Sequence, residues 1–156
     1  MNRKEQEEEK KAKKTNDMSE PKKIREIYNI GSKNLILEEE TYAIISAAME
    51  VYYKLGDGFL EPVYQKALAY EFDLRGVPFE AQKQLPIMYK DHQLKKGYFA
   101  DFLCYGQIIV EIKAISALSP IDWSQIMNYL KARRLRVGLL FNFGSQVRPE
   151  TKRIVI

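Results

Sequence analysis

The stretch Ile108-Ile109-Val110-Glu111-Ile112-Lys113-Ala114-Ile115 lies past the middle of the chain and determines how the rest is interpreted. It is apolar and rich in β-branched residues, which is typical of a buried strand. It also carries Glu111 and Lys113, whose side chains point to the same face because strand side chains alternate. A charged group in a water-poor interior is costly unless it is paired or ligated. The pair therefore indicates either a Glu–Lys pair on an exposed face or a hydrolytic site that uses a metal ion.

A second carboxylate, Asp101, precedes this stretch. If Tyr105-Gly106-Gln107 forms a three-residue hairpin loop, with Gly106 at positive φ, Asp101 lies opposite Glu111. Residues opposite each other share a sheet face, with Cβ atoms about 5 Å apart. A two-residue loop would instead place the two carboxylates on opposite faces. The register is therefore a prediction on which the site depends.

Two carboxylates that close repel each other, and one stays protonated unless a cation lies between them. Together with the carbonyl oxygen of Ile112, Asp101 and Glu111 form a set of hard oxygen ligands, which predicts Mg²⁺ or Mn²⁺. Lys113, on the same face, can orient or deprotonate a water or stabilise charge on a phosphate oxygen. Because Glu-x-Lys tripeptides are common on exposed strands, the partner carboxylate Asp101 is what favours a site.

The composition predicts one globular domain with a hydrophobic core: 156 residues, 46% hydrophobic and 29% charged. A single cysteine, Cys104, excludes an intrachain disulfide and a multi-cysteine zinc site, and a single histidine, His92, argues against a Ser-His-Asp triad. No apolar run approaches about 18 residues, and the charged N-terminus lacks a signal-peptide core, so we expect a cytoplasmic protein without a membrane span. The net charge of +4 permits a nucleic-acid partner.

The chain divides into a charged tail and one domain. Residues 1–26 hold nine Lys or Arg and seven Asp or Glu with few large apolar groups, which predicts a disordered or fraying helical tail. Residues 27–156 form the expected domain, and they begin with a linker or short strand at 27–37.

The expected elements give a single α/β domain with a central mixed sheet flanked by helices. A helix from Glu38 is ended by Gly56. The next runs from about Phe59 to Arg75, capped by Asp57 or Gly58, with Leu60, Val63, Tyr64, Ala67, Leu68 and Phe72 on its apolar face. Strands are predicted at 78–89, 92–103, 107–115 and 136–143, a helix capped by Ser119 at 118–134, and an edge strand at 153–156.

Two further candidates lie on the helices. Glu61 falls in the first turn of the second helix, where a carboxylate is also favoured by the helix dipole alone. Gln125 lies on the helix after the strand, where the pattern alone favours a surface amide. On pattern alone, neither residue is assigned to the site.

A basic, acid-free segment between Trp123 and Pro149 is a candidate for binding phosphates. Its candidate nucleic-acid contacts are Lys131, Arg133, Arg134 and Arg136. Such contacts give salt-sensitive affinity without sequence preference, although cations at a helix C-terminus also complement the dipole. No base-reading module is visible, so a sequence-specific enzyme would need a homodimer or a partner protein.

The segment Gly58-Phe59-Leu60-Glu61-Pro62-Val63-Tyr64 resembles the motif that names the GxxExxY protein family. The similarity continues through 100–103, 110–114, 125–132 and 138–144. That family is grouped with the PD-(D/E)XK nuclease superfamily, which has a restriction-endonuclease-like fold. The resemblance implies that Asp101, Glu111 and Lys113 form the core site, with Glu61 as a helix carboxylate and Gln125 as the helix glutamine of related nucleases.

The sequence departs from the family pattern at three positions. Ala100 stands where the superfamily name has proline, Tyr52 where relatives often have histidine, and Phe99 where they have arginine before the aspartate. The first position varies in the superfamily, so little follows from Ala100. Any role of the other two positions in binding phosphate or substrate is in doubt here. Tyr64 is part of the motif, but its spacing also suits packing on the apolar face of the helix.

Together these observations predict a metal-dependent nuclease that hydrolyses phosphodiester bonds of nucleic acid, with DNA and RNA both open. The alternative is a catalytically inactive module on the same fold that binds nucleic acid or a protein. Charges kept in an apolar strand favour the enzyme, because an inactive site has no reason to retain them.

Overall fold

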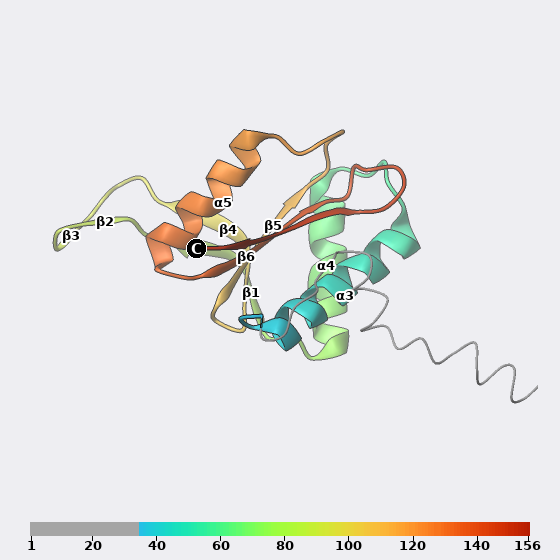
Figure 1. Ribbon diagram of the computed structural model, residues 1–156, viewed down its shortest axis with the longest axis horizontal. Helices are drawn as coiled ribbons and strands as arrows, with labels where there is room; N and C mark the ends of the chain where they lie inside the picture. The colour runs from blue at the N-terminus through green and yellow to red at the C-terminus, as the bar shows by residue number, and fades with distance from the viewer. Residues whose placement is uncertain (1–34) are drawn as a thin grey trace, which may run out of the picture. The chain divides into compact units, whose positions relative to one another are not determined.

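The computed structural model describes residues 35–156 (Figure 1). The predicted tail at 1–26 and most of the 27–37 segment lie outside the described residues. The elements are α3 (Glu38–Leu55), α4 (Glu61–Arg75), β1 (Phe79–Leu85), β2 (Met88–Tyr89), β3 (His92–Gln93), β4 (Tyr98–Cys104), β5 (Ile108–Lys113), α5 (Pro120–Arg133), β6 (Val137–Asn142) and β7 (Glu150–Val155). In this part of the chain, no helix is both long and apolar enough to cross a bilayer.

The central sheet has five strands in the order β1-β4-β5-β6-β7. β5 and β6 are parallel, whereas the other three neighbouring pairs are antiparallel. A parallel pair needs a crossover connection, and α5 supplies it between β5 and β6. The predicted α/β fold with a mixed central sheet is confirmed, and the predicted C-terminal edge strand begins earlier, at Glu150.

Helices cover both faces of the sheet, with α5 on one side and α3 and α4 on the other (Figure 1). On the α4 side, the ring of Phe72 contacts that of Phe102 at a centroid distance of 5.3 Å. On the α5 side, Ile126 and Leu130 pack on Leu103 and Ile109 in one buried cluster. The two layers leave the middle strands β5 and β6 almost wholly buried, as their apolar sequences predict.

The start of α4 differs from the prediction. Its N-cap is Leu60, which makes no side-chain capping bond, so neither Asp57 nor Gly58 caps the helix. Leu60 is 79% exposed and Val63 is also exposed. The buried stripe is narrower than predicted and consists of Tyr64, Leu68 and Phe72, which lie four residues apart along one face.

The predicted strand at 92–103 is two strands. β3 pairs only with β2, in a small hairpin that turns at Lys90-Asp91 as predicted. The peptide N–H of Leu94 bonds the carbonyl of Ile87 and closes this hairpin, and the following Lys95-Lys96-Gly97 carries the chain into β4. The hairpin projects beyond the sheet beside the C-terminal end of α5 (Figure 1).

Candidate active site

The register of β4 and β5 is the one that the site requires. Cys104 pairs with Ile108 and Phe102 with Val110, so the connection has the predicted three residues. Tyr105 and Gly106 take φ values of 53° and 64°, which close this tight turn. Continued by one residue, the register sets Asp101 opposite Glu111.

At that position, side chains replace the backbone ladder. The N–H of Asp101 donates to Glu111 Oε1 at 3.0 Å, and the N–H of Ile112 donates to Asp101 Oδ2 at 2.8 Å. Each carboxylate therefore accepts a hydrogen bond from the opposite strand. These crossed bonds hold the two acids side by side, because moving either one would leave a peptide N–H unpaired.

The ladder between β4 and its other neighbour, β1, is interrupted at the same point. The β1–β4 ladder passes from the pair Ala81 and Phe102 to the pair Lys83 and Ala100, without pairing Gln82 to Asp101. Gln82 has a φ of 51°, in the left-handed region that a non-glycine residue adopts only at a cost. Both ladders of β4 thus break at Asp101.

This interruption changes the face to which β4 side chains point. Tyr98 stacks near Tyr129 of α5, with ring centroids 4.9 Å apart, whereas Phe102 contacts Phe72 of α4. Tyr98 and Phe102 are an even number of residues apart, so a regular strand would direct both to one face. The strand therefore switches faces at Ala100-Asp101, where its hydrogen bonds go to side chains.

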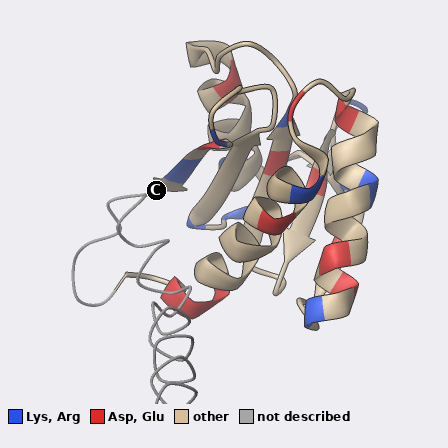
Figure 2. Ribbon diagram, turned by 90° about the vertical axis from the view of Figure 1, so that its right-hand side faces the viewer, with Lys and Arg blue, Asp and Glu red and all other residues tan. Residues whose placement is uncertain are grey.

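Burial and the neighbouring charge of Asp101 disfavour the ionised form of Glu111. Glu111 is only 4% exposed, and burial raises its pKa to about 9, with the negative charge of Asp101 as the next cause. Figure 2 shows acidic segments within the sheet as well as on the helices. A cation bound beside these carboxylates would relieve both effects.

Glu61, in the first turn of α4, is influenced by the charges of Asp101 and Lys113. Burial raises the pKa of Glu61, the charge of Asp101 raises it further, and Lys113 opposes the shift. These influences show that Glu61 lies within electrostatic reach of both residues. The helix start that Leu60 and Pro62 define is what directs Glu61 toward the sheet.

Lys113 is held by α5. Its Nζ donates to Gln125 Oε1 at 3.0 Å and lies 3.9 Å from Asp122 Oδ1. Gln125 Nε2 in turn donates to the hydroxyl of Tyr129 at 2.7 Å. Asp122 also forms the capping box with Ser119, so its carboxylate is fixed at the start of the helix. The ammonium is therefore oriented by one helix and carried by the strand beside the two carboxylates.

In a comparison with protein families, the model of the PD-(D/E)XK nuclease superfamily matches residues 38–154. The chain belongs to this superfamily. Comparisons with curated proteins and with solved structures gave no significant match. Membership in this nuclease superfamily implies a nucleic-acid substrate, and its nucleases generally use divalent metal ions.

The donor set of this PD-(D/E)XK domain fits a hard divalent ion. In residues 35–156, no three His, Cys, Asp or Glu side chains already converge into a metal-binding cluster. Asp101 and Glu111 nevertheless offer paired carboxylate oxygens, which are ligands that a hard divalent ion prefers, and a cation would offset their repulsion. Glu61 and the carbonyl of Ile112 are the remaining candidates for ligands.

Sequence analysis missed a buried amide beside Lys113. Asn142 is fully buried at the end of β6 and is the Cα partner of Lys113. Its Oδ1 accepts bonds of 3.0 Å from the N–H groups of Ile115 and Gly144, which fixes the ends of both strands. The signal was available, because a polar residue in an apolar strand needs a partner, as Glu111 does. The links of Lys113 to Asp122 and of Gln125 to Tyr129 needed the helix orientation and could not be inferred.

Tyr64 and Tyr52, which the sequence analysis considered for function, both use their hydroxyl groups in hydrogen bonds within the fold. Tyr64 is fully buried, stacks on Phe143 at 4.7 Å, and its hydroxyl donates to the carbonyl of Gly56 and accepts from the N–H of Phe59. The hydroxyl of Tyr52 is committed to the carbonyl of Ser145 at 2.6 Å. Tyr64 therefore closes the loop between α3 and α4 that presents Glu61.

The predicted basic surface is divided. Lys131, Arg133 and Arg134 line one hollow at the end of α5. Arg136 does not line it, and its Nε instead donates to the carbonyl of Ile156 at 3.5 Å. Lys131 and Arg133 lie on the same helix as Gln125 and Arg134 is the C-cap of that helix, whereas Arg136 lies beyond it, next to the C-terminal residue Ile156.

Proposed function

We propose that this protein is a metal-dependent nuclease that hydrolyses phosphodiester bonds of nucleic acid. The observation that carries the proposal is the crossed bonding of Asp101 and Glu111 on neighbouring strands, with Lys113 following on the same strand. A structural role would not require a buried carboxylate beside a second one, since burial and the neighbouring charge of Asp101 raise the pKa of Glu111 to about 9. Membership in the PD-(D/E)XK nuclease superfamily favours the same conclusion.

We assign the metal ligands to Asp101, Glu111 and the carbonyl of Ile112, with Glu61 contributed by α4. Mg²⁺ or Mn²⁺ bound there would supply a Lewis acid for the phosphoryl group and lower the pKa of a water molecule. The ammonium of Lys113 neutralises charge on a phosphate oxygen, whereas in its neutral amine form Lys113 would accept a proton from the attacking water. Gln125 keeps that ammonium in position through its 3.0 Å bond.

We further propose that the chain is a GxxExxY protein within the superfamily. The motif has a physical basis here: Gly58 takes a φ of 100° in the loop, Glu61 opens the helix, and Tyr64 ties the loop down. The proposed nuclease domain spans residues 27–156. Its proposed phosphate contacts are Lys131, Arg133, Arg134 and Arg136.

The test combines metal binding with cleavage. Mn²⁺ is titrated calorimetrically into the wild type, Asp101→Ala and Lys113→Met, and each is assayed on mixed DNA and RNA substrates. We expect Asp101→Ala to lose both binding and cleavage, and Lys113→Met to bind the metal while cleaving about 100-fold more slowly or worse. Lys66→Met, which removes an exposed lysine from the middle of α4, is the control and should match the wild type.

The alternative is an inactive module that binds nucleic acid or a protein. It is favoured by the absence of a preformed cluster of three acids among the described residues. This alternative predicts salt-sensitive association that does not depend on metal. A wild type that takes up no Mn²⁺, even with nucleic acid present, would establish it in place of the enzyme.

A further inference from the structure

Two hollows follow α5 away from the candidate active site. The first, of about 290 Å³, is lined by Gln125, Tyr129, Tyr98 and Asn128 among others. The second, of about 580 Å³, shares Tyr98 and Asn128 with the first and continues to the end of the helix. Because Gln125 bonds Lys113, the first hollow lies beside the site, and the two shared lining residues make the second hollow its neighbour.

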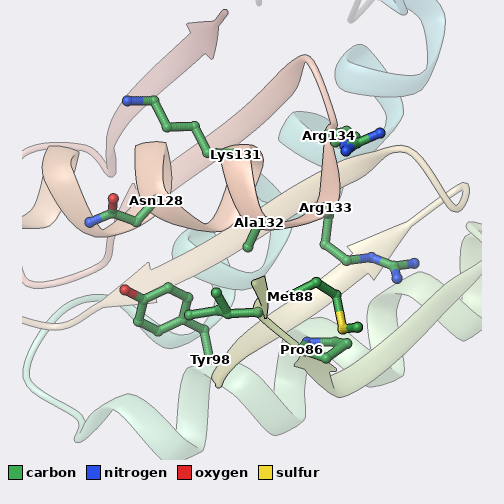
Figure 3. A pocket seen from close by; sticks show the side chains of 9 residues that line it. Pro86, Met88, Tyr98, Asn128, Lys131, Ala132, Arg133 and Arg134 are labelled. Atoms are coloured by element: carbon green, nitrogen blue, oxygen red, sulfur yellow. The ribbon is translucent and has the colours of Figure 1, made fainter. Parts of the chain in front are cut away.

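One side of the second hollow is basic. It is lined by Lys131 and Arg133 from α5 and by Arg134, the C-cap of that helix, and none of the described residues that line either hollow is acidic. In Figure 3, Arg133 reaches toward Met88, whereas the ammonium of Lys131 extends toward the end marked by Asn128. Cations spaced along this hollow suit successive phosphates of one strand.

The opposite side and the floor are aromatic and apolar. Tyr98 is fixed on the floor by its contact with Tyr129. The β2–β3 hairpin contributes Met88, which is 55% exposed, to this lining. Tyr89 follows it on the hairpin, outside the lining of both hollows, and is 64% exposed. The ammonium of Lys90 lies 5.6 Å from the Tyr89 ring centroid. Apolar side chains this exposed on a projecting hairpin do not contribute to the core and are available to a ligand.

We propose that these two hollows and the hairpin form a binding track for a single strand of nucleic acid that continues from the active site, with its phosphates on the α5 side and its bases against Tyr98, Met88 and Tyr89. Stacking on an exposed tyrosine needs the flat face of a base, which a duplex keeps covered by its neighbours. The direction of the track rests on the proposed nuclease function. The track itself rests on the charge and exposure of its own residues.

The test is binding without cleavage. Fluorescence polarisation in EDTA measures the affinity for labelled single-stranded DNA and RNA of one sequence, about 12 nucleotides long, and for the two matching duplexes. We expect the single strands to bind more tightly than their duplexes, and comparison of the two strands identifies DNA or RNA as the preferred ligand. Equal or tighter binding of the duplexes would overturn the proposal.

Matched variants locate the track. Tyr89→Ser should weaken single-strand binding about 5- to 100-fold through lost stacking, whereas Tyr70→Ser, which removes a tyrosine of similar exposure from α4, should not. Arg133→Gln should weaken binding and lower the salt dependence, whereas Arg148→Gln, outside the hollows, should change neither. Equal effects within either pair would refute the track. Thermal unfolding of each variant confirms that it is folded.

The outcome separates this proposal from the nuclease. If wild type cleaves with Mn²⁺ but Tyr89→Ser binds and cleaves normally, the track is wrong and the nuclease stands. If Tyr89→Ser and Arg133→Gln lose single-strand binding while the wild type never cleaves, the track stands and the nuclease is wrong.

Discussion

The peptide N–H of Asp101 donates a 3.0 Å hydrogen bond to Glu111 Oε1 at the position where the ladder between β4 and β5 stops. The strand backbone is thus bonded to the acids themselves. Removing the charge of an acid and removing its hydrogen-bonding oxygen should therefore have different consequences.

Asp101→Asn separates these two effects. Asparagine keeps an oxygen that can accept from the N–H of Ile112 but lacks the charge that raises the pKa of Glu111. Urea unfolding in EDTA should give a free energy of unfolding equal to or above that of the wild type, while Mn²⁺ affinity falls by about 100-fold or more. Asp101→Ala, which leaves that N–H without its acceptor, should cost about 1–3 kcal/mol. Equal destabilisation by both variants would contradict the crossed-bond geometry.

The stability of the metal-free protein should depend on the ionisation of Glu111. Its folded-state pKa of about 9 lies above the ordinary value of 4.5, so between these values the unfolded chain binds fewer protons. The stabilisation is complete below about pH 4.5 and is lost as pH rises toward about 9. Urea unfolding in EDTA across this range should show that decline. Glu111→Gln should flatten it, and an unchanged slope in that variant would assign the pH dependence to other groups.

Tyr64→Phe tests whether the motif tyrosine positions Glu61. The variant keeps the stacking on Phe143 but loses two hydrogen bonds to the α3–α4 loop, so we expect a loss of about 1–2 kcal/mol. Tyr52→Phe also loses a buried bond, to Ser145, and is the control. Both should lower stability in urea, but only Tyr64→Phe should weaken Mn²⁺ binding. Equal effects of the two on metal binding would show that Tyr64 has only a packing role.

Asn142→Ala should be among the more damaging changes outside the acids. It leaves the N–H groups of Ile115 and Gly144 without their acceptor, at an expected cost of about 2–4 kcal/mol. Thr151→Val serves as the comparison, because the buried hydroxyl of Thr151 has no partner among the described residues. Removal of this hydroxyl should leave the free energy of unfolding unchanged or raise it by up to about 1 kcal/mol. Thermal unfolding compares the stability of the two variants. A larger loss of stability in Thr151→Val than in Asn142→Ala would refute this account.

Gln82 should tolerate glycine better than a β-branched residue. Its φ of 51° is costly for a side chain, so Gln82→Gly should raise the free energy of unfolding by up to about 1 kcal/mol. Gln82→Val should lower it by about 1 kcal/mol or more, because a β-branched residue fits this conformation poorly. Urea unfolding distinguishes the two. A more stable valine variant would mean that β1 is regular at this residue.

Most of the fold could be predicted because periodicity and end signals agree locally. Gly56 and Gly76 end their helices at positive φ, and Ser119 with Asp122 forms the capping box. The extent of burial could not be predicted in the same way. Leu60 and Val63 have suitable hydrophobicity and spacing, but α4 lies on aromatic side chains of the sheet that only the tertiary structure brings beneath it.

The same distinction between local signals and tertiary contacts applies to the candidate site. Asp101, Glu111 and Lys113 could be proposed together because one turn length fixes their register, and that register is confirmed. Whether they act on nucleic acid stays a prediction. Contacts between distant elements, such as Lys113 with Gln125 and the fully buried Asn142, depend on how α5 and β6 lie against β5, which local sequence does not encode.

The change of face in β4 has a consequence for how the domain unfolds. Tyr98 is partly buried and packs against the core under α5, whereas Phe102 lies in the core under α4, so one strand contributes to both layers. Loss of either core would pull β4 away from its partners and expose the other. The two layers should therefore melt as one cooperative unit, and Asp101, at the point where the strand crosses between them, keeps its place only while both are intact.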